Sequence, residues 1–322
     1  MRMNSFLWIP GKGMDSSALK RLQSHFPRPK EPMGEAWFMG EQRRMFPELL
    51  GDLASLPVQD IQAPLGEISS GFSSFGPMKE WNSWYHYLLA QTLPRAHDEH
   101  VYSLLESLVT GFMAVYPNGV YSTAYKTFRE DVLLTLERCM MEPSCWNGSQ
   151  IAVGRVLKRS NNNPNRVWCW WYASGDFSSS MFFCLKYLPE ELVGNWLRSV
   201  LDIPSPHWRA QMLVWMVGAH DLLAGVVNWP SEFEDRARPA VSWDWSHCLA
   251  DRLAATDSSG AAVMKSLLAE SVRRDALELF RLHFSEDVFL EWLESIGSVF
   301  YLKEELAEIP EAFETLYVRN RG

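Results

Sequence analysis

The chain has few cysteines, five in 322 residues. A disulfide-stabilised scaffold needs a dense and even set of cysteines, so this small, odd number excludes such a scaffold and fits a reducing compartment. We therefore expect a cytoplasmic protein. Long apolar runs are missing as well, because Pro117-Asn118-Gly119 interrupts the longest uncharged run, residues 107–125. No segment is expected to span a membrane.

Strict alternation of apolar and polar residues, which marks a half-buried strand, is almost absent from the sequence. From about residue 78 onward the apolar residues recur every three to four positions, which is the period of a helix packed on one side. The sequence therefore predicts an all-α fold of stacked antiparallel helical hairpins. Two forms stay open, an irregular α-solenoid and a compact helical bundle. Helices are expected at about 189–201, 206–225, 241–256 and 261–283.

Residues 1–77 differ from the rest because prolines and glycines recur throughout them. That density is expected to prevent long helices. We therefore predict an irregular N-terminal segment at 1–77 and a helical domain at 78–322. The serine- and glycine-rich stretch 69–76 is expected to be a loop that joins the two parts.

Two short helices fit this N-terminal segment. The first is expected at about 15–25, where Asp15 or Ser16 has the short polar side chain that caps a helix N-terminus. The second is expected at about 42–56.

Tryptophan is unusually frequent, with fifteen residues in the chain. Tryptophan buries a large apolar area and carries one N–H donor, so it is common both in cores and at interface hot spots. We expect most of the tryptophans to form a helical core and leave open that several line a partner surface. The helix at 206–225 is apolar on every side, so we place it at the centre of the core, with Leu213 and Trp215 buried.

Acidic residues dominate the C-terminal end of a chain whose formal net charge is −9. Residues 286–314 contain nine acids against a single base, Lys303. We predict an acidic face that docks a protein partner with a basic surface, with a solvated surface that serves solubility as the alternative. The predicted interaction residues are Glu291, Glu294, Glu304, Glu305, Glu308 and Glu311.

A basic stretch lies in the middle of the chain, at residues 155–171. Its bases flank an asparagine-rich loop, and tryptophans follow directly. Bases next to aromatic rings are typical of surfaces that bind single-stranded nucleic acid, so phosphate or nucleic-acid contact is a further hypothesis. The residues that would make it are Arg155, Lys158, Arg159, Arg166 and Trp168.

Histidines and cysteines are scattered through the helical region. His97 and His100 have a spacing that can chelate a metal, but they fall near an expected helix start, where polar residues are common anyway. No metal centre and no cofactor are predicted. His220 precedes Asp221, yet adjacent side chains on a helix diverge, so His220 would need another carboxylate to act as a base.

These features favour a non-catalytic interaction protein that acts through helical surfaces. Such a protein would serve as a scaffold, an accessory subunit or an inhibitor, and a defence or immunity component fits that description. One alternative is a hydrolase-type enzyme, and the other is a nucleic-acid-binding accessory protein that uses residues 155–171. The enzyme would use His207, His220, His247 and Cys248.

Overall fold

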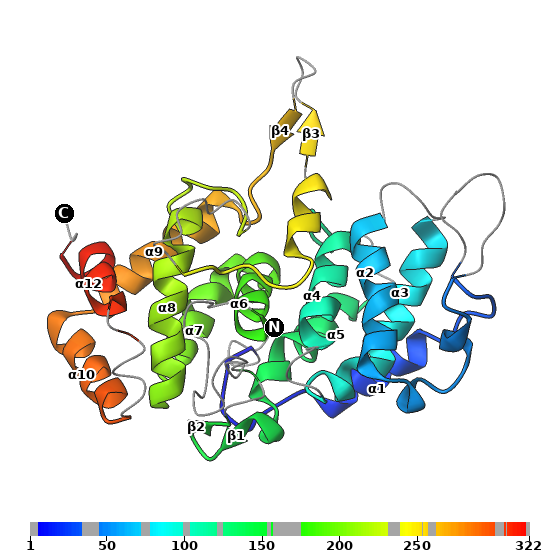
Figure 1. Cartoon of the computed structure of the whole chain (residues 1–322), viewed down its shortest axis with the longest axis horizontal. Coiled ribbons are helices and arrows are strands. Elements are labelled where there is room, and N and C mark those ends of the chain that lie inside the picture. Colours follow the sequence, from blue (N-terminus) through cyan, green and yellow to red (C-terminus); the bar gives the residue numbers. More distant parts are fainter. Residues whose placement is uncertain are drawn as a thin grey trace. The chain divides into compact units, whose positions relative to one another are not determined.

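A computed structural model describes most of the chain (Figure 1). The described residues are 6–33, 45–71, 78–98, 104–120, 125–152, 156, 175–230, 239–252, 254–256, 262–299, 306 and 308–319. Helices dominate this part of the chain, so the expected all-α class is confirmed, in the form of a helical bundle. The strands in it form two small two-stranded sheets. They are β1 (Trp146–Asn147) with β2 (Gln150–Ile151), and β3 (Ala254–Thr256) with β4 (Ala262–Met264).

The chain divides into two compact units, and each is formed by segments that are distant in sequence. The first unit comprises Met1–Gly13, Met140–Trp243 and Met264–Gly322. The second unit comprises Met14–Cys139 and Asp244–Val263. The boundary expected at residue 77 lies outside the described residues and stays a prediction.

The second unit contains the first five α-helices. They are α1 (Ser16–His25), α2 (Val58–Gly71), α3 (Met78–Thr92), α4 (Leu104–Val115) and α5 (Phe128–Leu133). Short 3-10 helices accompany them at η1 (Pro47–Leu50), η2 (Leu53–Ser55), η3 (Leu93–Arg95) and η6 (Ser246–Arg252). A further 3-10 helix, η4 (Leu136–Met141), begins in this unit and ends in the first. The expected first helix and its cap are confirmed, because the Asp15 carboxylate accepts a hydrogen bond from the Ala18 N–H at 2.8 Å.

Helix α2 corrects the expectation that prolines exclude long helices from the N-terminal segment. It runs for 14 residues with Pro64 inside it. Ile61, Leu65 and Ile68 are fully buried on one face, and this burial outweighs the backbone hydrogen bond that proline removes. The loop expected at 69–76 is also wrong at its start, since Ser69 lies in α2 and its hydroxyl donates to the Leu65 carbonyl.

The second short helix, expected at about 42–56, is wrong in its described part. Two separate 3-10 turns, η1 and η2, occupy this stretch. Gly51 adopts an extended conformation between them, and Asp52 then caps η2 through the Ala54 N–H at 3.0 Å. Asp52 thus begins a new element where the expected helix would have continued.

The first unit contains the remaining α-helices. They are α6 (Asp176–Tyr187), α7 (Glu190–Leu201), α8 (Pro206–Leu223), α9 (Glu270–His283), α10 (Glu286–Gly297) and α12 (Ile309–Phe313). A 3-10 turn, η5 (Pro143–Cys145), precedes β1, and a π-helical turn, η7 (Glu314–Arg319), follows α12. Helix α8 is the core helix that the sequence predicts, because it packs against α9, α10 and α12 (Figure 1). Leu213 and Trp215 are both fully buried, as expected.

Tryptophan contributes mainly to the core, as predicted. Trp8 packs edge-on against Trp196 and Trp208, with ring centroids 5.3 and 5.8 Å apart. Trp208 and Trp215 lie on α8 and Trp196 lies on α7, so these rings join the N-terminal residues of the first unit to its helices.

One expected helix in the C-terminal half is wrong, and another is confirmed except at its start. The stretch 241–256 forms η6 and β3 rather than one α-helix. Trp245 has φ +60°, a left-handed conformation that interrupts a helix. The last expected helix begins at Glu270, with β4 in place of its first turns.

Candidate functional site

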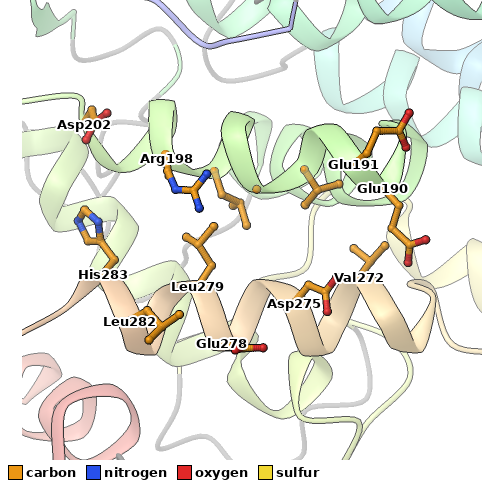
Figure 2. Close-up of a pocket in the computed structure, with 13 residues that line it drawn as sticks. Glu190, Glu191, Arg198, Asp202, Val272, Asp275, Glu278, Leu279, Leu282 and His283 are labelled. Atoms are coloured by element: carbon orange, nitrogen blue, oxygen red, sulfur yellow. The ribbon is translucent and has the colours of Figure 1, made fainter. Parts of the chain in front are cut away.

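A groove of about 530 Å³ lies between α7 and α9 of the first unit (Figure 2). We call it the α7–α9 groove. Each helix buries one face in the unit, since Trp196 and Val200 of α7 and Ala276 and Phe280 of α9 are fully covered. The opposite faces of both helices therefore stay available to line the groove.

The two helices run parallel along the groove. Figure 2 shows Glu190 and Val272, near the two N-termini, at one end, and Asp202 and His283, at the two C-termini, at the other. Helices that are neighbours in sequence run antiparallel when a short loop joins them, but α7 and α9 are separated by α8 and a long connection. The groove thus has two chemically different ends.

Most of the charged residues that line the groove are carboxylates. Those on its rim are Glu190, Glu191, Asp202, Asp275 and Glu278. The lining contains a single arginine, Arg198. The helix dipole accounts for Glu190 and Glu191, which lie in the first turn of α7. It does not account for Asp275 and Glu278, which lie further along α9.

Asp275 has a weak basic neighbour. The Arg274 side chain approaches its carboxylate at 3.3 Å, but both side chains are more than half exposed. An exposed pair of this kind contributes little, so the Asp275 carboxylate stays able to meet a positive group in the groove.

Apolar side chains form the floor between the carboxylates. Leu197 and Val272 are buried in the floor, and Leu282 is 76% exposed beside it. Leu282 thus extends the apolar floor to the edge of the groove.

Gly194 deepens this floor. It lies in the middle of α7, where glycine costs a helix roughly 0.5–1 kcal/mol relative to alanine. A Cβ at this position would meet only the Leu279 Cδ1, at 3.7 Å, which is ordinary van der Waals contact. Packing within the chain therefore does not require glycine here, and its effect is to leave room in the groove.

The C-terminal end of the groove carries a different group of charges. Burial lowers the pKa of His283. The negative charges of Asp202 and Glu291 oppose that shift, whereas the positive charge of Arg209 adds to it. Arg209 Nη2 donates to Glu291 Oε1 at 3.1 Å, and its guanidinium lies over the Trp292 ring at 5.3 Å. Glu291, one of the predicted interaction residues, therefore already has a basic partner within the chain.

The other residues of the predicted acidic face are placed in part. Glu294, Glu308 and Glu311 are exposed. Their apolar neighbours on α10 and α12, such as Trp292 and Phe313, are buried. Glu304 and Glu305 lie outside the described residues, and docking by this face stays a prediction.

The predicted nucleic-acid contact cannot be placed on the structure. All five of its residues lie outside the described part of the chain: Arg155, Lys158, Arg159, Arg166 and Trp168. Nucleic-acid binding through them stays a prediction.

The histidines and cysteine of the enzyme alternative do not gather at one place. His207 and His220 lie near opposite ends of α8, roughly 20 Å apart at 1.5 Å per residue. His247 and Cys248 belong to the second unit. The expectation that Asp221 cannot reach His220 is wrong, since Asp221 Oδ1 lies 3.4 Å from His220 Nδ1.

The possible metal ligand His97 has a structural contact. His97 is buried, and its Nε2 lies 3.1 Å from the Cys139 carbonyl oxygen. Among the described residues, no group of three or more histidine, cysteine or acidic side chains is arranged to hold a metal ion. Nor does any helix in that part of the chain combine the length and the apolar character needed to cross a bilayer.

The groove was not predicted from the sequence. The three-residue spacing of Asp275 and Glu278, which puts both on one face of a helix, was the available clue. Nothing in the sequence shows that α7 and α9 are neighbours, because α8 and a long connection separate them.

No protein-family model matches the chain, and neither a curated protein nor a solved structure matches it. The function must therefore be argued from the geometry and chemistry of the site.

Proposed function

We propose that this protein is a non-catalytic interaction protein that binds a basic, amphipathic protein segment in the α7–α9 groove. The observation that carries the proposal is an apolar floor, opened by Gly194, inside a rim of five carboxylates. Apolar side chains of the partner would cover Leu279 and Leu282, and lysine or arginine side chains would meet Asp275 and Glu278.

The size of the groove supports a short segment as the partner. A volume of about 530 Å³ is in the range of sites that enclose a small molecule or a few side chains. One face of a helix presents a few side chains at three- and four-residue spacing, which matches a groove between two helices. Binding of this kind suits an accessory subunit or an inhibitor of a larger assembly.

The first test uses a synthetic peptide as the probe, a labelled amphipathic helix of leucine and lysine about four turns long. We expect the double variant Asp275→Lys with Glu278→Lys to weaken binding at least about tenfold, because repulsion replaces two attractive contacts. The matched control is Glu48→Lys with Glu67→Lys, two exposed acids of the second unit that make the same change in net charge. Fluorescence anisotropy measures both affinities.

Two substitutions of Gly194 test the floor separately from the charge. Gly194→Leu should fill the groove and abolish peptide binding, whereas Gly194→Ala adds one methyl group in ordinary contact with Leu279 and should retain it. Equal binding by the double charge variant and its control, or by Gly194→Leu and the wild type, would overturn the proposal. Circular dichroism of each variant checks that the helices are intact.

A further inference from the structure

Glycines inside two helices of the second unit are seats for aromatic rings. A Cβ at Gly66 of α2 would lie 3.1 Å from Cε2 of the Trp245 ring. A Cβ at Gly111 of α4 would lie 2.6 Å from Cε2 of the Tyr85 ring. Both rings therefore rest directly on helix backbone that a larger residue would cover. The packing of the ring offsets what glycine costs a helix.

Gly194 of α7 is a seat of the same kind that faces the α7–α9 groove. Within the described part of the chain, a Cβ there would come near a single atom of another element, Leu279 Cδ1 at 3.7 Å. Leu279 therefore forms a wall beside the seat, and no ring of the described residues covers Gly194. A groove of about 530 Å³ has room for an aromatic side chain at this point.

Arg198 lies one helical turn from this seat. Residues four positions apart share one face of a helix, so the Arg198 side chain and the space above Gly194 belong to the same side of α7. Figure 2 shows the Arg198 side chain extending into the groove toward Leu279. Its Nη1 donates to Asn195 Oδ1 at 3.0 Å, and this contact is exposed, so the guanidinium can exchange it for another.

We infer that the α7–α9 groove takes an aromatic side chain of its partner, which lies flat on Gly194 with the Arg198 guanidinium over its outer face. This inference rests on the proposed function and specifies the anchor residue of the partner. An aromatic ring has a negative face and a positive edge, so the face suits a guanidinium and the edge suits the carboxylate rim. The first unit already contains such a pair, since the Arg209 guanidinium lies 5.3 Å from the centroid of the Trp292 ring.

The test uses basic amphipathic peptides that differ at one apolar position and are held helical by the same side-chain crosslink. That position carries phenylalanine, leucine or cyclohexylalanine, whose saturated ring is close to phenylalanine in size, and it is moved along the apolar face from peptide to peptide. At the best position we expect phenylalanine to bind about three- to tenfold more tightly than leucine, because its ring fills the seat on Gly194. Fluorescence anisotropy measures the affinities.

Two substitutions locate the ring. Gly194→Ala should remove most of the advantage of phenylalanine over leucine and retain the leucine peptide, because the added methyl group lifts a flat ring off the helix. Arg198→Gln should lower the ratio of phenylalanine to cyclohexylalanine affinity about two- to fivefold, because the saturated ring has no π face for a cation. The matched control Arg129→Gln, on an exposed residue of α5 in the second unit, should leave that ratio unaltered.

Methyl NMR gives a readout that does not depend on affinity. The Leu279 methyl signals, assigned with Leu279→Met, should shift in the ring current of the bound phenylalanine, because Leu279 Cδ1 lies beside the seat. The cyclohexylalanine peptide has no ring current, so it should shift the same signals much less.

The outcomes separate this inference from the proposed function. If none of the peptides binds the wild-type protein, the groove is not a docking site and both fail. The inference alone is overturned if phenylalanine and leucine bind equally at every position, or if Gly194→Ala weakens both to the same degree. It is also overturned if Arg198→Gln leaves the ratio of phenylalanine to cyclohexylalanine affinity unchanged.

Discussion

His86 lies in an aromatic cluster of the second unit. Its ring stacks on Phe26 with centroids 4.6 Å apart, and Nε2 lies 2.6 Å from the Tyr116 hydroxyl. Burial lowers the pKa of His86 from 6.5 to about 4. The folded protein therefore holds this imidazole neutral at pH values where the unfolded chain protonates it.

This difference predicts a loss of stability in mild acid. The unfolded chain binds more protons between the two pKa values, so the stabilisation by neutral His86 is complete above about pH 6.5 and is lost as the pH falls to about 4. The loss amounts to about 3 kcal/mol of the free energy of unfolding. His86→Phe keeps the stack on Phe26 but cannot titrate, so its stability should fall less over this range. Denaturant unfolding of both proteins from pH 7 to pH 4 measures the difference, and parallel pH profiles would contradict the prediction.

At the scale of helices, two glycines in α7 and α8 have opposite roles. Gly218 lies on α8 where a Cβ would be 2.5 Å from the Pro239 carbonyl oxygen and 2.6 Å from Val241 Cγ1. These distances are too short for any side chain, so glycine allows the segment 239–241 to pack against the core helix. Gly194 on α7 faces the groove and has no such neighbour.

The same substitution at these two positions should therefore change stability in opposite directions. Gly218→Ala should destabilise by about 1–3 kcal/mol, because a backbone carbonyl must move to admit the methyl group. Gly194→Ala should stabilise by up to about 1 kcal/mol, because alanine is the better helix former and the site is open. Thermal or denaturant unfolding measures both, and a destabilised Gly194→Ala would show that the groove is packed rather than open.

The elements that could be predicted from the sequence are those whose signals are local. The Asp15 cap and the all-round apolar character of α8 are visible within a few residues, and both expectations are confirmed. Helix α2 was missed because its stability comes from tertiary burial of Ile61, Leu65 and Ile68, which no local rule about Pro64 contains. The α-helix expected at 241–256 failed for the opposite reason: its apolar residues Val241, Trp243 and Leu249 are buried, but the left-handed backbone at Trp245 interrupts the chain between them.

At the scale of the whole molecule, the candidate site depends on contacts between distant segments. The residues of the groove come from α7 and α9, and the rest of the first unit must fold to bring them together. The second unit likewise depends on a contact between distant residues, because the Glu106 carboxylate accepts a hydrogen bond from the Asp244 N–H at 2.9 Å. Periodicity along the chain reveals the helices but not these pairings, so the acids of the groove could not be recognised as a set.

Net charge is the other property of the whole molecule that bears on binding. A formal charge of −9 attracts a basic peptide from a distance, whereas only residues in the groove hold it after docking. Long-range attraction changes the association rate, and short-range contacts mainly change the dissociation rate. The acidic face and the groove should therefore be separable by kinetics.

Two pairs of substitutions with the same change in net charge test this separation. Glu294→Lys with Glu311→Lys alters the acidic face outside the groove, and Asp275→Lys with Glu278→Lys alters the groove itself. For the leucine–lysine peptide, we expect the first pair to slow association about two- to fivefold at low salt, with an unchanged dissociation rate. This effect should fade above about 0.15 M salt, where the screening length is about 8 Å.

The second pair should speed dissociation about tenfold at every salt concentration, because it removes contacts that the solvent does not screen fully. Stopped-flow measurements over a salt series give both rates. An increase in dissociation rate from the first pair as large as that from the second would assign docking to the acidic face as well.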